Sequence, residues 1–150
     1  MDYNDVTKHL GACGLDCVRC ADYEHGEIKK LSIKLLQALG INYARVAKMK
    51  SVKLPFFSNY SQFEEILIAF SQASCGGCRS NNLLCPIECA AKTCVREKSI
   101  DFCFQCADYP CEKQFQISGK QGERWMKISD RMKEIGVIDY YYEQFKLPRY

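Results

Sequence analysis

Apolar residues recur at helical spacing in the first half of the chain. In the first such stretch, leucine and isoleucine side chains repeat three or four positions apart, and Gly40 follows where a helix would stop. The stripe consists of Ile28, Leu31, Leu35, Leu36 and Leu39, with Lys29, Lys30 and Lys34 on other faces. The pattern predicts an amphipathic helix that ends just before Gly40.

A second helix is expected to begin at Ser61-Gln62-Phe63-Glu64. Its serine and glutamate match a capping box, in which each side chain accepts a bond from the other residue's backbone N–H. Ile66, Leu67 and Phe70 continue on one stripe. The sequence therefore predicts two amphipathic helices between residues 26 and 72.

The segment between these two helices, residues 41 to 58, has no clear period. It contains the run Val52-Lys53-Leu54-Pro55-Phe56-Phe57, which mixes apolar, basic and helix-breaking residues. We interpret it as an ordered connection that packs its aromatic side chains inward.

A further helical stripe lies near the C-terminus, from about residue 121 to 135. Gly136 follows as its stop, and we expect the aromatic tail from Tyr140 to Tyr150 to fold back onto the domain. Basic and acidic residues alternate on the opposite side, which is typical of a solvated helix surface. The buried stripe would be Trp125, Ile128, Met132 and Ile135, and the basic residues opposite are Arg124, Lys127 and Arg131.

The chain has 150 residues, about the size of one ordinary domain, and can bury a core without covalent help. No apolar run approaches a membrane span, and the first residues lack the basic start and apolar stretch of a signal peptide. We expect a cytoplasmic, mainly α-helical single domain over residues 1–150. A helical insertion at about 26–72 would separate two groups of cysteines.

Eleven cysteines stand out in the composition, three at positions 13 to 20 and eight at 75 to 111. Cytoplasmic thiols are kept reduced, and the count is odd, so metal ligation explains them better than a disulfide framework.

Three cysteine pairs have two intervening residues, a spacing that lets a tight turn aim two sulfurs at one ion. Two such pairs complete a tetrahedral zinc site. The turn Cys75-Gly76-Gly77-Cys78 is the clearest, because its glycines permit positive φ angles and expose backbone N–H groups to the sulfurs. The pairs are Cys17/Cys20, Cys75/Cys78 and Cys103/Cys106.

Eight ligands for two ions require a fourth pair, and two choices are open. Cys85 and Cys89 are four apart across a proline, which suits a first helical turn with both sulfurs on one face. Cys89 and Cys94 are five apart and need a helix end or a bend between them. Cys111 either joins the ion of the neighbouring pair or packs nearby as a small buried hydrophobe.

The spacing of Cys13, Cys17 and Cys20 also matches the three cysteines with which radical S-adenosylmethionine enzymes hold a four-iron cluster. Those enzymes need a partial or complete β/α barrel, and this chain lacks the alternation of strands and helices that a barrel requires. An iron–sulfur cluster without radical chemistry is the alternative to zinc.

Catalysis by a cysteine nucleophile needs a base. The chain has two histidines, His9 and His25, and neither stands in a recognisable catalytic context. No glycine-rich phosphate loop or paired-carboxylate motif is present. The sequence gives no positive evidence for an active site, so we expect a binding or adaptor module rather than an enzyme.

The formal net charge of +3 would favour nucleic-acid binding only if bound metal were ignored. A zinc ion held by four thiolates carries a charge of −2, so two such sites move the total from +3 to −1. Charge therefore gives no support for a nucleic-acid partner. We expect no membrane partner, and a protein partner stays open.

Four segments in combination resemble the prokaryotic domain of unknown function 3795. The resemblance covers most of the chain and extends to the final Pro148-Arg149-Tyr150. It implies a cysteine-rich, zinc-binding, prokaryotic protein, and it implies no activity because the family has none assigned. By the resemblance Cys89 and Cys94 form the fourth pair. The segments are Cys13-Gly14-Leu15-Asp16-Cys17-Val18-Arg19-Cys20, Cys75-Gly76-Gly77-Cys78-Arg79, Cys89 to Cys94 with Arg96-Glu97-Lys98, and Phe102-Cys103-Phe104-Gln105-Cys106-Ala107-Asp108-Tyr109-Pro110-Cys111-Glu112-Lys113.

We therefore predict a zinc-finger-like domain of helices and irregular loops organised around about two structural zinc ions. One ion would join the Cys17/Cys20 pair to the Cys103/Cys106 pair, because the first cysteine segment offers only three thiols and no other cysteine precedes Cys75. The eight predicted ligands are Cys17, Cys20, Cys75, Cys78, Cys89, Cys94, Cys103 and Cys106, with Cys13, Cys85 and Cys111 as further candidates.

Overall fold

The structure, a computed structural model, describes residues 1–114 and 120–150. Over these residues the chain is mainly helical, as predicted, and contains no β-strand, only an isolated antiparallel bridge between Leu10 and Asp16. No helix in this part of the chain is long and apolar enough to cross a membrane. The helices are α1 (Tyr3–His9), α2 (Glu27–Leu39), α3 (Tyr43–Ser51), α4 (Tyr60–Ser71), α5 (Ala91–Glu97), α7 (Lys120–Ile135) and α8 (Val137–Phe145), with 3₁₀ turns η1 (Pro55–Asn59) and η2 (Cys103–Gln105).

The chain divides into two compact units. Unit 1 contains Met1–Cys20 and Cys75–Tyr150, and unit 2 contains Ala21–Ser74. All eleven cysteines belong to unit 1. The candidate metal chemistry is therefore confined to unit 1.

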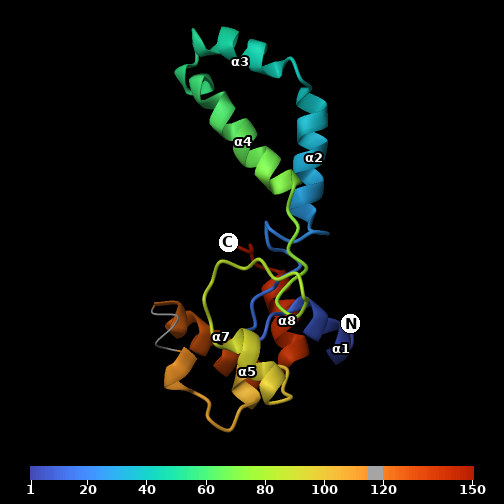
Figure 1. The fold of residues 1–150 in the computed structure, drawn as a ribbon, viewed down its shortest axis with the longest axis vertical. Helices are drawn as coiled ribbons and strands as arrows, with labels where there is room; N and C mark the ends of the chain where they lie inside the picture. The colour runs from blue at the N-terminus through green and yellow to red at the C-terminus, as the bar shows by residue number, and fades with distance from the viewer. Residues whose placement is uncertain (115–119) are drawn as a thin grey trace. The chain divides into compact units, whose positions relative to one another are not determined.

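Unit 2 is a helical hairpin in which α2 packs against α4, and α3 and η1 connect their far ends (Figure 1). The predicted first helix is confirmed as α2. Its C-cap is Gly40, whose φ of 68° lies in the left-handed region and whose N–H donates to the carbonyl of Leu36. Proline stands in the first turn of η1, where its missing N–H is not needed.

The second predicted helix is confirmed as α4, but its predicted capping box is wrong. The helix begins at Tyr60 with Asn59 as N-cap, and no side chain caps it. Ser61 Oγ instead donates to the Gln62 side chain, while Glu64 accepts from the Tyr60 hydroxyl. Because η1 runs directly into α4, the helix already has a preceding turn at the place where a capping box would start it.

The predicted burial of unit 2 is only partly right. Leu31 and Leu35 of α2 are exposed, whereas the small Ser32 between them is buried. The connecting segment forms α3 and η1, and Phe56 is exposed rather than packed inward. Two packed helices share one narrow line of contact, so a stripe as wide as the sequence pattern suggests is not fully covered.

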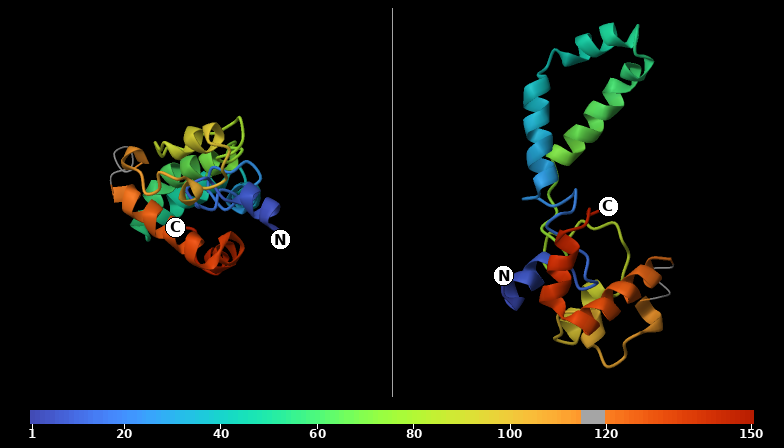
Figure 2. Two further views of the ribbon diagram at one scale, coloured as in Figure 1. Left: turned by 90° about the horizontal axis from the view of Figure 1, so that it is seen from below. Right: turned by 180° about the vertical axis from the view of Figure 1, so that it is seen from behind.

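Unit 1 is built around an aromatic and aliphatic core. Figures 1 and 2 show α8 alongside α1 and α7, and these helices supply most of the core together with the loop at Phe102. A smaller cluster joins α5 to the loop after α1 through Ala12, Ala91 and Val95. The main core consists of Val6, Leu10, Phe102, Met132, Val137, Tyr140 and Tyr141.

The C-terminal helix is confirmed, but Ile128 and Ile135 of its predicted buried stripe are only partly buried. The predicted helix is α7, with Trp125 and Met132 buried, and Gly136 (φ 86°) ends it by donating to the Met132 carbonyl. The tail folds back as α8 and buries Tyr140 and Tyr141 in the core.

Gly14 lies where the loop after α1 crosses α7. Its φ of 79° is in the left-handed region, and a Cβ atom added there would stand 2.6 Å from Met132 Cε and closer still to the Ile128 side chain. Glycine is thus required twice, for its backbone conformation and for its lack of a side chain.

Replacing this glycine tests how tightly the loop packs on α7. We expect Gly14→Ala to lower the free energy of unfolding by about 2–5 kcal/mol, the sum of left-handed strain and overpacking. Gly136→Ala is the matched control, because Gly136 has a similar φ but open space around it, so strain alone should cost about 1–2 kcal/mol. Urea unfolding followed by fluorescence of Trp125, the one tryptophan of the chain, measures both variants. Equal losses would contradict the packing account.

Candidate metal centre

The eleven cysteines are free thiols, and nine of them lie near one another in two groups. The first thiol group consists of Cys13, Cys17, Cys78 and Cys89, and Cys20 and Cys85 lie beside it. The second thiol group is Cys94, Cys103 and Cys111.

The loop that follows α1 carries Cys13 and Cys17. The N–H of Gly11 donates to the Leu15 carbonyl at 2.8 Å and closes the loop. The N–H of Cys17 then donates to the His9 carbonyl at 2.8 Å, which returns the chain to the end of α1. Two backbone bonds therefore hold both thiols at the C-terminal end of α1.

Cys78 reaches the same place from the glycine turn. Gly77 has the positive φ, 90°, that the sequence predicts for this turn. A Cβ atom added to Gly11 would stand 3.3 Å from Cys17 Sγ and 3.6 Å from Cys78 Sγ. Both sulfurs therefore lie close to Gly11 and to each other. The backbone N–H of Cys78 also donates to the Cys17 thiol. Cys17 and Cys78 are thus direct neighbours although they are far apart in the sequence.

Burial is the main cause of a raised pKa at three thiols of the first group. It raises the pKa of Cys13 to about 12 and that of Cys17 to about 11, and it raises the pKa of Cys89 as well. Neighbouring thiols raise these pKa values further, because one thiolate disfavours another. Cys13 has Cys78, Cys89 and Cys17 as neighbours. Cys17 has Cys78, Cys20 and Cys85 as neighbours. Cys89 has Cys78 and Cys85 as neighbours.

Backbone N–H groups nevertheless point at these sulfurs. Leu15 donates to Cys13 and Lys92 donates to Cys89, and each bond lowers the pKa of its thiol against the effect of burial. Such bonds favour the thiolate and are typical of the groups that surround metal-bound sulfur. Further bonds join the N–H of Leu84 to Cys75 Sγ and the N–H of Asp108 to Cys106 Sγ, both at 3.4 Å.

The second thiol group surrounds η2. Burial raises the pKa of Cys103 to about 12, and the nearby thiols of Cys111, Cys89 and Cys94 add to the effect. The indole of Trp125 lies beside Cys103 and lowers the pKa of its thiol. Because Cys89 neighbours Cys103 and also belongs to the first group, the two groups are adjacent.

Cys106 lies on the more open side of η2. Its sulfur accepts a bond from Lys98 Nζ at 3.1 Å, and Lys98 also pairs with the Asp108 carboxylate. These two partners, the carboxylate first, raise the pKa of Lys98. A lysine therefore supplies positive charge beside this thiol.

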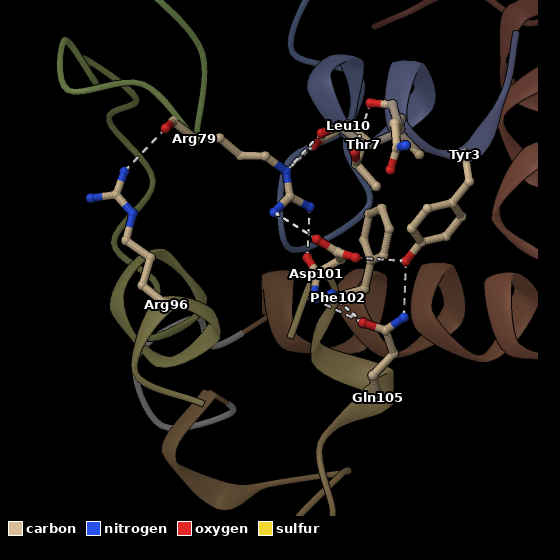
Figure 3. A network of polar contacts seen from close by, with 9 residues as sticks. Tyr3, Thr7, Leu10, Arg79, Arg96, Asp101, Phe102 and Gln105 are labelled. Atoms are coloured by element: carbon tan, nitrogen blue, oxygen red, sulfur yellow. Dashed lines mark hydrogen bonds and ion pairs between the residues drawn. The ribbon is translucent and has the colours of Figure 1, made fainter. Parts of the chain in front are cut away.

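Arg79, the residue after Cys78, ties together the chain segments that carry the thiols (Figure 3). Its Nε donates to the carbonyls of Thr7 at 2.7 Å and Leu10 at 3.2 Å, at the end of α1. Its terminal nitrogen donates to the carbonyl of Asp101 at 2.6 Å. The guanidinium also lies over the Phe102 ring, 5.1 Å from its centre.

A second layer of polar contacts supports the Asp101 side of this network (Figure 3). Tyr3 donates to the Asp101 carboxylate at 2.9 Å and accepts from the Gln105 amide at 3.0 Å. The Gln105 side-chain oxygen accepts from the N–H groups of Asp101 and Phe102, both at 2.9 Å. The sequence pattern marked Arg79 only as a member of a cysteine motif and gave no signal of this role.

The thiols do not form a finished ligand shell. Among the residues that the structure describes, no three His, Cys, Asp or Glu side chains converge closely enough to hold a metal ion. The donor chemistry still fits a thiophilic metal, because several partly buried sulfurs share one region and receive N–H bonds.

The predicted pairing of ligands stays a prediction. Around Cys17 the thiol neighbours are those of Cys20, Cys78 and Cys85, whereas the sequence joined Cys17 and Cys20 to Cys103 and Cys106. Cys13 and Cys111, which the sequence analysis kept only as further candidates, have well-defined thiol neighbours. The loop geometry that brings Cys13 to Cys78 has no signature in residue spacing.

Comparison with known proteins places the chain in a family. Residues 9–116 match the family described as protein of unknown function (DUF3795), and the chain belongs to this family. The match covers both thiol groups and confirms the resemblance inferred from the cysteine motifs. No curated protein and no solved structure matches the chain.

The Arg79 network predicts a strong and specific mutational effect. Arg79→Lys keeps the charge but loses the fork that reaches three carbonyls, so we expect the free energy of unfolding of unit 1 to fall by about 2–4 kcal/mol. Arg96→Lys is the matched control, because Arg96 is exposed and makes only 3.3 Å bonds to the carbonyls of Arg79 and Ser80. Urea unfolding followed by Trp125 fluorescence compares the two. The network would be unimportant if both variants lost the same small amount.

Proposed function

We propose that this DUF3795 protein is a metal-thiolate protein that holds two zinc ions through its cysteines as structural sites, and that unit 1 serves as a metal-stabilised binding or adaptor module. The observation that carries the proposal is the first thiol group. Its sulfurs are gathered in one region, their pKa values are raised by burial, and N–H groups are directed at them.

The electrostatics of the group favour a cation. Buried thiols with raised pKa values stay protonated at neutral pH, and one thiolate disfavours the next. A divalent ion reverses both effects, since it removes the protons and neutralises the charge of the sulfurs it binds. Zinc suits sulfur ligands and has no geometric demand beyond four donors.

The proximity of the sulfurs favours a pairing different from the one based on spacing. Cys17 and Cys78 flank Gly11, so we propose that both bind the same ion, with further ligands from the rest of the first thiol group. Cys103 would bind the other ion with Cys94 and Cys111. In the pairing based on spacing, Cys17 shares its ion with Cys103 and not with Cys78.

Double substitutions separate the two pairings by metal content. We expect Cys17→Ser and Cys78→Ser each to lose one zinc, because a hydroxyl is a poor zinc ligand. The double variant should also lose only one zinc, because the two substitutions remove the same site. Cys17→Ser with Cys103→Ser should lose two. Elemental analysis and native mass spectrometry of protein purified without air give the stoichiometry. A loss of two ions from Cys17→Ser/Cys78→Ser and of one from Cys17→Ser/Cys103→Ser would instead support the pairing based on spacing.

An iron–sulfur cluster is the second candidate, favoured by the spacing of Cys13, Cys17 and Cys20 together with the proximity of Cys17 to the other two. The same anaerobic sample decides between the metals. A colourless protein with zinc supports the structural module, whereas a brown protein with iron and visible absorbance supports a redox role.

A further inference from the structure

The tip of unit 2 exposes a set of large apolar side chains. We define the tip as residues 41–57, which include α3 and the start of η1. Ile41 is 95% exposed, Val52 84% and Phe56 66%. Figure 1 shows α3 at the end of the hairpin opposite to the end where the chain enters α2 and leaves α4. Exposed apolar side chains gathered in this way mark a surface that binds something.

The same region carries only positive charge. From Ile28 to Phe63 the sequence contains seven lysine or arginine residues and no aspartate or glutamate. Lys50 is held in place, with its Nζ 3.3 Å from the Tyr43 hydroxyl and 5.0 Å from the centre of the Phe57 ring. The basic residues on the tip are Arg45, Lys48, Lys50 and Lys53. The modest net charge of the whole chain hides this local accumulation.

The apolar and basic groups are interleaved. A cavity of about 450 Å³ on the tip is lined by four apolar residues and two lysines, namely Val46, Met49, Val52, Leu54, Lys50 and Lys53. The exposed lining of this hollow is almost entirely apolar, and the basic residues belong to the same short segment, so a partner with apolar groups and negative charge fits the tip.

In contrast to the sequence-based expectation of no membrane partner, we propose that the tip of unit 2 docks onto an anionic phospholipid surface. Basic side chains would lie among the phosphate groups, and the exposed aliphatic and aromatic side chains would enter the boundary between headgroups and acyl chains. Ile41 and Val52 protrude from the two ends of α3, which suits insertion into a soft surface better than docking into a fixed protein groove. The two most exposed apolar side chains of the tip, Ile41 and Val52, are aliphatic and cannot stack on bases, which favours a lipid surface over a nucleic acid.

Vesicle binding by the full-length chain, purified under reducing conditions, tests the proposal. Vesicles of phosphatidylcholine with phosphatidylglycerol should bind the protein, whereas vesicles of phosphatidylcholine alone should not, and added salt should weaken binding. Lys48→Glu/Lys53→Glu should weaken binding by at least about thirtyfold, since each basic residue contributes roughly fivefold at such a surface. Ile41→Ser/Val52→Ser should weaken it by about tenfold or more, because both side chains lose their apolar burial.

Matched controls make a loss of binding specific. Lys34→Glu/Lys127→Glu changes the charge equally at exposed lysines outside the tip, and Leu84→Ser/Leu147→Ser removes exposed leucines of unit 1. Both controls should bind within about threefold of the unchanged protein, because they change no residue of the tip and salt screens charges outside the contact. No binding of the unchanged protein to anionic vesicles would overturn the proposal, and so would equal losses in the controls. If the protein binds an acidic amphipathic helical peptide but not vesicles, the partner of the tip is a protein and not a lipid surface.

Discussion

The guanidinium of Arg79 makes the interaction on which the arrangement of the thiols depends. It spans from the end of α1 to the carbonyl of Asp101 and lies over the Phe102 ring. Arginine suits this task because its planar fork carries a permanent charge and several donors. Since Cys78 is its neighbour in the chain, the network fixes one sulfur of the first thiol group against the loop that carries Cys13 and Cys17. These hydrogen bonds thus bring the sulfurs together, but they do not neutralise the charge of the thiolates.

The charge of the cysteine thiolates is not balanced by the Arg79 network. Burial raises the pKa values of Cys13, Cys17 and Cys103, while backbone N–H groups favour the thiolates of Cys13 and Cys17. Protonated thiols leave these N–H groups with weak acceptors, and unneutralised thiolates repel one another. The proposed zinc ions remove this conflict. A structural zinc site contributes on the order of 10–16 kcal/mol, which equals or exceeds the net stability of about 5–15 kcal/mol of a typical domain.

The sequence predicted those parts of the fold that depend on local rules. The helices α2 and α7 and their glycine stops follow from hydrophobic period and backbone freedom, which act over a few residues. The capping box at Ser61 failed because η1 precedes α4, and the inward packing of Phe56 failed because the tip has no third layer to cover it. Both depend on neighbouring elements that residue spacing does not encode.

The candidate site shows the same division. The cysteine spacing and the glycine turn at Gly77 were readable from the sequence, and so was the family. The proximity of Cys13 to Cys78 was not, because it results from the closed loop after α1 and from the reach of Arg79. The exposed basic tip was missed for a different reason, since averaging charge over the chain conceals a segment without acidic residues.

We propose that bound metal holds unit 1 together, and Trp125 is placed to report it because its indole lies beside Cys103. The most direct measurement is Trp125 fluorescence together with circular dichroism, recorded under reducing conditions before and after a strong chelator is added. The account predicts that chelation shifts the Trp125 emission towards that of the unfolded chain and removes the unfolding transition of unit 1, and that restored zinc reverses both. Unchanged fluorescence, helical signal and melting temperature after verified metal removal would contradict it.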